Sequence, residues 1–323
     1  MRAVVLRAFN APLELEERER PTPRNAEDSV VRVLACGVCH SDLHVVERFF
    51  GSELPLVLGH EIAAEDARLG NVLVYTPWGC GECRFCRATE EMMCPDAREA
   101  GLFQDGGYAE YLRVPARRYL YPIGDLDPVH AATLGCGGLT SYRAVKHARP
   151  WLRAGARALV LGAGGLGQFA IQYLRLLTDA EVHVGDPVAH KRERALALGA
   201  VHAAESADLE GPYAAVLDFV GADDSLAHAA RLVDRQGVAI VIGLFGGRIP
   251  FGLGAVPNEA HFMSSIWGSR DELAELIELA QREPLQYTIE TMPLERAQEA
   301  HDLIRSRRAH GRIVLTPFCT GEV

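Results

Sequence analysis

A glycine-rich turn between a buried strand and a helix constrains the fold of this 323-residue chain more than any other segment. The apolar run 158–161 leads into the turn 162–167, whose sequence is Gly-Ala-Gly-Gly-Leu-Gly, and apolar residues at helical spacing follow over 169–177. A G-x-G-x-x-G turn in this position lets the backbone approach a pyrophosphate at the N-terminus of the helix. The segment therefore predicts the first βαβ unit of a dinucleotide-binding domain.

The next predicted strand, 181–186, supplies the acidic residue that such a site requires. Asp186 ends this strand about 20 residues after the glycines, where a carboxylate accepts hydrogen bonds from ribose hydroxyls. The same charge repels a 2′-phosphate, so NAD is favoured over NADP. Lys191, one of two lysines in the chain, is either a ribose contact or a solvated residue at a helix start. Continued alternation predicts a doubly wound parallel sheet with strands at 214–220 and 238–244 and a helix at 226–233.

Local signals predict three further boundaries. The dipeptide Gly70–Asn71 is typical of a turn. Ser269 and Glu272 form a capping box that starts a helix, which Pro284 ends, and a second helix is predicted from Glu295 to about Arg307.

A second dense segment combines thiols and imidazoles. The sequence CGVCHSDLH at 36–44 is followed by GHE at 59–61, and the two stretches could supply a thiolate and an imidazole to zinc. We interpret Cys39 as the ligand and Cys36 as a buried thiol on a strand over 30–35. A catalytic zinc uses three protein ligands and keeps one position open. The isolated Cys136, between glycines, is a candidate third ligand, although a lone cysteine is equally often part of a core.

Four further cysteines predict a closed metal site. Their spacing over 80–94 is C-x2-C-x2-C-x7-C, which can wrap one ion tetrahedrally and is typical of structural zinc. An iron–sulfur cluster is the alternative, because C-x2-C-x2-C runs also hold such clusters.

Charge and hydropathy exclude several partner classes. A net charge of −10 argues against nucleic acid or an anionic membrane as the main partner. No apolar run approaches the roughly 20 residues of a membrane span, and residues 1–7 are typical of a first strand rather than a signal peptide. We therefore expect a cytoplasmic protein, in which the eight cysteines stay reduced.

Taken in order, the motifs resemble those of the zinc-dependent medium-chain alcohol dehydrogenases, in the bacterial, NAD-dependent form that carries a structural-zinc lobe. The likeness covers nearly the whole chain and rests on CGVCHSDLH, GHE, the four-cysteine lobe, GCGGLTSYRA, GAGGLG and GRIVL. It implies an α/β protein with a GroES-like, mainly β catalytic domain over 1–137 and 267–323. A Rossmann domain with a doubly wound parallel sheet, binding NAD, is implied over 138–266. It also implies a homodimer or homotetramer that oxidises a primary or secondary alcohol reversibly.

Carried over by position, the resemblance gives each site residue a role. The implied ligands of the catalytic zinc are Cys39, His60 and Cys136, and those of the structural zinc are Cys80, Cys83, Cys86 and Cys94. Glu61 would lie behind the catalytic zinc, Asp42 would accept a hydrogen bond from His60, and Ser41 and His44 would relay a proton. The implied cofactor contacts are His40, Thr140, Gly162, Gly164, Gly165, Leu166, Gly167, Asp186, Lys191, Ile242, Leu244 and Arg312.

The chain departs from the family between Glu61 and Val72, where roughly a dozen residues, about one hairpin arm, are missing. This shortening affects the shape of the substrate cleft and the subunit contacts. Four aromatic residues near cleft-lining segments indicate a largely apolar substrate, unless they belong to the core: Phe49, Phe50, Tyr75 and Trp78. A polyol dehydrogenase is the alternative enzyme. A zinc- and NAD-binding protein without turnover is the alternative from another class, and the Ser41–His44 pair counts against it.

Overall fold

Two compact units make up the chain. The computed structural model describes residues 1–318. The first unit contains Met1–Cys136 and the chain from Ser269 onward, and the second contains Gly137–Gly268. One junction lies one residue earlier than expected from the sequence, and the other lies two residues later.

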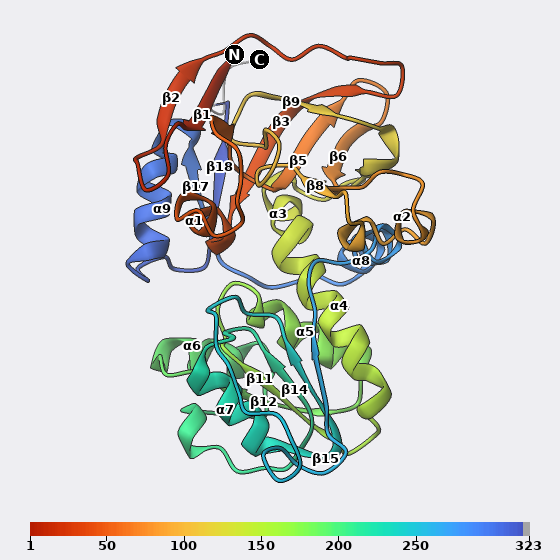
Figure 1. Ribbon diagram of the computed structural model, residues 1–323, viewed down its shortest axis with the longest axis vertical. Coiled ribbons are helices and arrows are strands. Elements are labelled where there is room, and N and C mark those ends of the chain that lie inside the picture. Colours follow the sequence, from red (N-terminus) through yellow and green to blue (C-terminus); the bar gives the residue numbers. More distant parts are fainter. Residues whose placement is uncertain (319–323) are drawn as a thin grey trace. The chain divides into compact units, whose positions relative to one another are not determined.

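The first unit is mainly β structure (Figure 1). Strand β3 (Ser29–Val38) runs through its largest sheet and pairs antiparallel with β5, β9 and β18. Alternating burial along β3 places its apolar residues in the core and explains why this segment forms a strand. The other strands of this sheet are β5 (Glu61–Asp66), β6 (Gly70–Val74), β9 (Tyr111–Val114), β10 (Leu120–Pro122), β17 (Ile289–Pro293) and β18 (Arg312–Thr316). Two smaller sheets contain β1 (Arg2–Leu6), β2 (Glu14–Glu17) and β4 (Leu56–Val57), and β7 (Pro77–Trp78) and β8 (Arg98–Glu99).

Side-chain caps mark the start of several helices of the first unit, α2, α3 and α8 among them. Helix α8 starts where the sequence predicts it, because Ser269 Oγ accepts from the Glu272 N–H and the Glu272 carboxylate accepts from the Ser269 N–H. Helix α9 begins at Ala297, two residues after the predicted start, since a 3₁₀ turn takes residues Leu294–Arg296. These helices are α1 (His40–Val46), α2 (Arg84–Arg87), α3 (Pro128–Thr133), α8 (Arg270–Arg282) and α9 (Ala297–Arg305). Further short helical turns of this unit lie at Glu91–Met93 and Arg117–Tyr119, and the turn Leu134–Gly138 leads into the second unit, whose own short turns lie at Arg149–Trp151 and Ser206–Asp208.

The segment that is short relative to the family forms a tight hairpin. Strands β5 and β6 pair directly, with Asp66 opposite Gly70, so residues 67–69 alone make the turn. The sequence-based placement of the turn at Gly70–Asn71 is therefore wrong, since both residues belong to β6. The reason is an Asx turn: Asp66 Oδ1 accepts from the N–H groups of Arg68 and Leu69, at 2.9 and 3.0 Å. Gly70 then adopts a φ of +71°, which returns the chain to the ladder.

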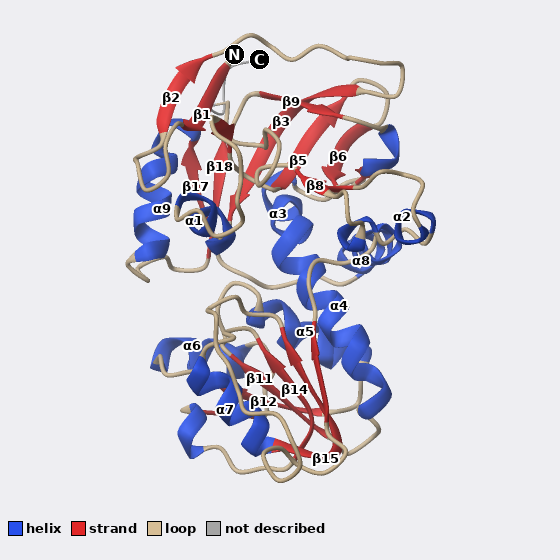
Figure 2. Cartoon of the chain, viewed as in Figure 1, coloured by secondary structure: helices blue, strands red, loops and turns tan. Residues whose placement is uncertain are grey.

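The second unit contains the predicted doubly wound sheet. Six parallel strands lie in the order β13-β12-β11-β14-β15-β16, so the first strand in sequence occupies the middle. Helices flank the sheet on both sides (Figure 2). The strands are β11 (Arg157–Leu161), β12 (Glu181–Gly185), β13 (His202–Ala204), β14 (Tyr213–Asp218), β15 (Val233–Val241) and β16 (His261–Ser264). The helices are α4 (Leu139–Ala148), α5 (Gly167–Leu177), α6 (Ala189–Ala197) and α7 (Asp223–Leu232).

Apolar side chains from the strands and helix α7 form part of the core of this unit, including Leu159, Leu161, Val216, Ala229 and Leu232. Strand β15 ends at Val241 rather than at the predicted residue 244, so Ile242 and Leu244 follow the strand. Within the part of the chain that the structure describes, every helix is too short or too polar to cross a lipid bilayer.

Candidate metal and cofactor sites

The junction between β3 and α1 fixes the first thiol. Cys39 caps α1, and the carboxylate of Asp42, at the third helical position, accepts from the Cys39 N–H at 2.9 Å. An acidic residue in the first turn of a helix satisfies backbone N–H groups that lack a partner within the helix. The Cys39 side chain is buried.

Three other elements bring their side chains to this thiol. His60 and Glu61 stand at the start of β5, and Cys136 lies in the π-helical turn after α3. Their donor atoms and the Cys39 Sγ all lie within 4.8 Å of one another, and all four residues are buried. Cys36 stays apart from this cluster, on β3 opposite Ile62 and Leu315, and burial raises the pKa of its thiol well above the usual value.

The charges of this cluster suit a divalent cation. The hydrogen bond from the Cys136 thiol lowers the pKa of Cys39 well below its usual value, which identifies Cys39 as the readier thiolate. Burial lowers the pKa of His60, but Asp42 outweighs this effect and raises it well above the usual value. A bound cation takes the place of the proton on the ligating atom of such a group. Because Asp42 Oδ1 lies 3.1 Å from His60 Nδ1, the other ring nitrogen of His60 is the one available to a metal.

Behind the thiols, Glu61 forms a buried ion pair with Arg312, whose Nη2 donates to Glu61 Oε2. Burial raises the pKa of Glu61 to about 7, while the neighbouring Arg312 opposes this rise. The sequence predicts Arg312 as a cofactor contact, and the structure adds Glu61 as a partner that spacing alone does not reveal. The cluster therefore fits a catalytic zinc with one open position: two thiols and an imidazole are the ligands, and the Glu61 carboxylate is paired with Arg312.

The four cysteines of the lobe also fit a metal. The Sγ atoms of Cys83 and Cys86 lie 3.6 Å apart, and those of Cys80 and Cys86 lie 3.9 Å apart. A tetrahedron with metal–sulfur bonds of about 2.3 Å has edges of about 3.8 Å. The N–H groups of Glu82 and Cys83 lower the pKa of Cys80 to about 7. The lobe therefore fits one closed ion, and an iron–sulfur cluster, whose several irons separate the thiolates further, does not fit.

Two residues of the predicted proton relay lie on α1. Ser41 Oγ is 3.8 Å from the Cys39 Sγ, which places the hydroxyl beside the metal cluster. His44 lies one helical turn further, with Nδ1 at 3.6 Å from a Glu47 carboxylate oxygen. Its ring contacts those of His40, Phe49 and Phe50, with centroids 5.1 to 6.3 Å apart.

The glycine-rich turn of the second unit fits a dinucleotide. Gly162 (φ +87°) and Gly167 are required by packing, because a Cβ at Gly167 would lie 1.9 Å from the Gly162 carbonyl oxygen. A Cβ at Gly164 would meet no protein atom within 4 Å, so the space beside this residue is open to a ligand at the start of α5. Asp186 organises the turn, since its Oδ2 accepts from the Ala163 N–H at 2.8 Å. Its Oδ1 accepts from the Val188 N–H, also at 2.8 Å.

The remaining predicted cofactor residues are distributed over both units. Thr140 is buried on α4, Lys191 is half-buried on α6, and His40 is exposed at the start of α1. Ile242 is buried and Leu244 is exposed after β15. Gly165 and Leu166 complete the turn before α5.

Of the four aromatic residues expected near the cleft, two belong to the interior. Tyr75 and Trp78 are buried, Trp78 donates from Nε1 to the Tyr75 carbonyl oxygen at 2.8 Å, and both rings contact Tyr119. The structure thus favours the core interpretation for this pair. Phe49 is exposed and Phe50 half-buried, and only these two lie next to the relay histidine.

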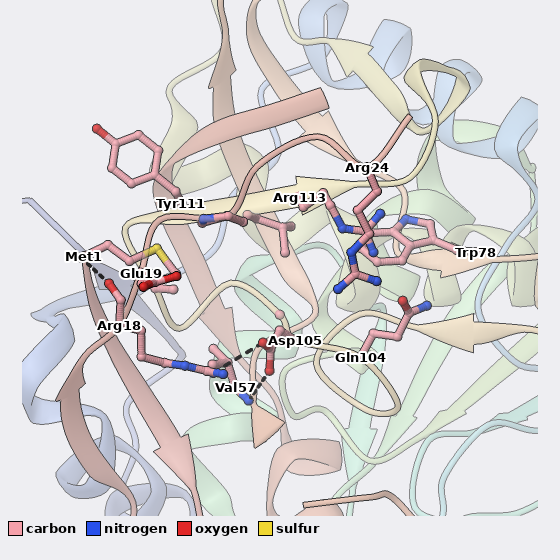
Figure 3. A pocket seen from close by; sticks show the side chains of 14 residues that line it. Met1, Arg18, Glu19, Arg24, Val57, Trp78, Gln104, Asp105, Tyr111 and Arg113 are labelled. Atoms are coloured by element: carbon pink, nitrogen blue, oxygen red, sulfur yellow. Dashed lines mark hydrogen bonds and ion pairs between the residues drawn. The ribbon is translucent and has the colours of Figure 1, made fainter. Parts of the chain in front are cut away.

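A pocket of about 310 Å³ in the first unit contains none of the metal-ligand candidates among its lining residues (Figure 3). Three arginines line it, but Arg18 is paired with Asp105 at 3.3 Å and Arg113 with Asp28 at 3.0 Å. These pairs neutralise much of its positive charge. The chemistry of the chain lies with the two cysteine clusters instead.

Two residues that the sequence does not single out contact the site. The Tyr108 hydroxyl donates to Asp42 Oδ2 at 2.9 Å, and the His301 Nε2 lies 3.3 Å from the same hydroxyl. Both side chains are buried. No spacing pattern identifies them, because they come from a loop and from a helix far along the chain.

Comparison with known proteins gives matches along most of the chain. Residues 25–125 match the family model for the alcohol dehydrogenase GroES-like domain, and residues 188–315 match that for zinc-binding dehydrogenases. An NAD-dependent alcohol dehydrogenase of Sulfurisphaera tokodaii is 34% identical over 350 aligned positions, covering 98% of this chain and 100% of that protein. The alignment is longer than this chain, which means that the relative carries residues that are absent from this chain.

A sugar-oxidising relative and a solved structure extend the comparison. A D-arabinose 1-dehydrogenase (NADP(+)) of Saccharolobus solfataricus is 32% identical, over 98% of this chain and 97% of that one. The crystal structure of an alcohol dehydrogenase from Aeropyrum pernix superposes with a TM-score of 0.91, at 30% identity, and covers 98% of this chain and 100% of its own.

Proposed function

The chain belongs to the zinc-dependent medium-chain alcohol dehydrogenases, and from this premise we propose that it oxidises small, largely apolar alcohols. The reaction is reversible hydride transfer from a primary or secondary alcohol to NAD, which gives an aldehyde or a ketone. The observation that carries the proposal is the convergence of Cys39, His60 and Cys136, with donor atoms within 4.8 Å.

We assign the first unit the task of deprotonating the alcohol. Cys39, Cys136 and a neutral His60 hold the catalytic zinc, and the two thiolates balance its charge. When bound, zinc supplies Lewis acidity that favours loss of the hydroxyl proton. The Ser41 Oγ, beside Cys39, would accept this proton while releasing its own, which His44 would pass towards solvent. Glu61 and Arg312 set the charge behind the thiolates.

The second unit binds the cofactor in this proposal. The backbone at Gly162, Gly164 and Gly167 and the N-terminus of α5 hold the pyrophosphate. Asp186 holds the ribose hydroxyls through lone pairs not used by the Ala163 and Val188 N–H groups. When bound, NAD supplies the hydride acceptor, and the chain supplies orientation and charge.

The substrate class rests on Phe49 and Phe50, which present apolar rings beside His44. The alternative is a polyhydric alcohol or sugar, and the D-arabinose 1-dehydrogenase relative favours it. A polyol site binds the additional hydroxyls through buried hydrogen-bonding groups. Such a site discriminates strongly against substrate analogues that lack these hydroxyls.

One assay separates these substrates. NADH formation is followed with matched primary, secondary and polyhydric alcohols, using wild-type protein and a Cys39→Ala variant. We expect the highest kcat/KM for an apolar alcohol and no turnover in the variant. A higher kcat/KM for polyols supports the alternative. Absence of NADH formation with every alcohol, and of NADH consumption with the corresponding carbonyl compounds, contradicts the proposal.

We also propose a homodimer or homotetramer located in the cytoplasm. Strand β16 is an edge strand, and Phe251 and Leu253 in the preceding loop are 73% and 101% exposed, which suits a subunit contact. Light scattering of the purified protein measures the assembly directly, and a monomeric mass contradicts it. Free thiols at both metal sites are consistent with a reducing compartment.

A further inference from the structure

The carboxylate of Asp42 receives three hydrogen bonds in a fully buried environment. The Cys39 N–H and the Tyr108 O–H donate to Oδ2, both at 2.9 Å, and the His60 Nδ1 donates to Oδ1 at 3.1 Å. Asp42, His60 and Tyr108 are each 0% exposed, so no solvent competes for these bonds. The orientation of the carboxylate, and with it that of the His60 ring, is therefore set by protein groups alone.

The tyrosine hydroxyl has one proton, and its direction defines the rest of the chain of contacts. Because Tyr108 donates to Asp42, its oxygen must accept from His301 Nε2, which lies 3.3 Å away. His301 is thus protonated on Nε2. Its Nδ1 has no hydrogen-bond partner among residues 1–318, which fits a neutral ring in which Nδ1 is unprotonated and its lone pair accepts no hydrogen bond. Burial lowers the pKa of His301, consistent with the neutral form.

Packing holds Tyr108 in this position. A Cβ at Gly59, one residue before His60, would lie 2.3 Å from the Tyr108 Cδ1, so the ring rests directly on this glycine (φ +89°). The His301 ring meets the Tyr108 ring edge-on, with centroids 5.9 Å apart. Helix α9, which carries His301, packs against α1, which carries Asp42 (Figure 1).

We propose that Tyr108 and His301 are positioning residues of the catalytic metal centre, acting through Asp42 on the His60 ligand. Hydrogen bonds to the remote nitrogen of a ligand imidazole fix its tautomer and orientation and raise its basicity. Loss of the Tyr108 hydroxyl leaves Oδ2 with the Cys39 N–H alone and frees the carboxylate to turn. Loss of the His301 donor weakens the hold on Tyr108. The inference rests on the proposed ligand set of Cys39, His60 and Cys136.

The test uses the intact protein with Co²⁺ in the catalytic site. Tyr108→Phe removes one hydroxyl and keeps the ring. The matched control is Tyr213→Phe, which removes a buried hydroxyl 3.1 Å from the His183 Nδ1 in the other unit. We expect Tyr108→Phe to shift the cobalt absorption bands and to release the metal to a chelator about 10- to 100-fold faster. The control should match the wild type in both measurements.

A second pair of variants decides the question even if Tyr108→Phe does not fold. His301→Leu removes the donor, whereas His301→Gln keeps an amide N–H at nearly the same place. Faster metal release and shifted bands in His301→Leu, with recovery in His301→Gln, support a positioning role. A purely structural role lowers the stability of these variants and leaves the cobalt spectrum unchanged.

Two outcomes overturn the inference, and they are distinguishable. Cobalt spectra and release rates equal to those of the wild type, in every variant that folds, overturn the inference alone. If the His60→Ala variant binds as much metal as the wild-type protein, the proposed ligand set is wrong as well, and the inference falls with it.

Discussion

Arg270 and Glu91 form an ion pair in which the Arg270 Nε donates to the Glu91 Oε1 at 2.7 Å. Glu91 belongs to the four-cysteine lobe and is fully buried, and Arg270 is the first residue of α8. The Arg270 N–H also donates to the Thr89 carbonyl oxygen at 2.9 Å. One residue therefore joins the lobe to a helix that lies 179 positions later in the chain.

Arg270→Met should destabilise the zinc-loaded protein by about 3 kcal/mol, because it leaves the Glu91 carboxylate buried without its partner. Adding Glu91→Gln should recover part of the loss. Urea unfolding measures both changes. Arg296→Met, which removes an exposed pair with Glu299, is the control and should leave the free energy of unfolding nearly unchanged, because exposed ion pairs contribute little. Equal effects of Arg270→Met and Arg296→Met contradict the prediction.

Elemental analysis should find two zinc ions per chain, one for each cysteine cluster. Cys39→Ala should lose one ion and all activity but remain folded. Cys83→Ala should lose the other ion together with much of the stability, since a closed structural site contributes folding free energy directly. One ion per wild-type chain, or iron in place of zinc, contradicts this assignment.

NAD should be preferred over NADP by at least tenfold in kcat/KM, a difference of about 1.4 kcal/mol. Asp186→Gly should narrow this preference. It should also weaken NAD binding, because the Ala163 and Val188 N–H groups lose their acceptor. Steady-state kinetics with both cofactors provides the measurement. An unchanged ratio in the variant places the discrimination at another residue.

The two relay residues should respond differently to substitution. His44→Gln should slow alcohol oxidation about 10²-fold, most strongly at low pH, where hydroxide is scarce. Ser41→Ala should be slower still, because its hydroxyl lies beside Cys39. Added imidazole should partly restore only the His44 variant. Wild-type rates in both variants from about pH 6 to 9, under conditions where hydride transfer limits the rate, exclude the relay.

His301 should make the protein sensitive to acid. Burial lowers its pKa, so the unfolded chain binds the proton at higher pH than the folded chain does. The free energy of unfolding therefore falls as pH drops below about 6.5, by at most about 1.4 kcal/mol per pH unit. Asp42, Asp302, Arg305 and the Tyr108 hydroxyl face this ring.

His301→Gln should flatten this pH dependence, measured by urea unfolding at pH values above and below 6.5. His261→Gln, at an exposed position, serves as the control and should leave the slope unchanged. A slope in His301→Gln equal to that of the wild type shows that other groups cause the acid sensitivity.

Local patterns were sufficient to predict much of this molecule. The capping box at Ser269 and the glycine turn at 162–167 depend on residues close in sequence, and both lie where they were expected. The ligand candidate Cys39 follows from its own stretch, whereas Cys136 required the order of motifs along the whole chain. The turn at 67–69 was missed because the Asp66 side chain, rather than a glycine, initiates it.

The contacts that could not be predicted join residues far apart in sequence. Tyr108 and Asp42 are separated by 66 positions, Tyr108 and His301 by 193, and Glu61 and Arg312 by 251. Such pairs form only when sheets and helices pack, so they cannot be predicted from the periodicity or the capping residues of a single element. They determine how the ligands are held, while the ligands themselves are recognisable from the sequence.

Strand β5 has the metal site at one end and the hairpin turn to β6 at the other. Glu61, beside the ligand His60, begins β5, and Asp66 ends it at the turn, roughly 17 Å away at about 3.3 Å per residue. Lengthening or shortening the chain at the turn changes the outer surface and leaves the ligand end in register. Relatives can therefore vary the outline of this region, and what docks there, while they inherit the same metal chemistry.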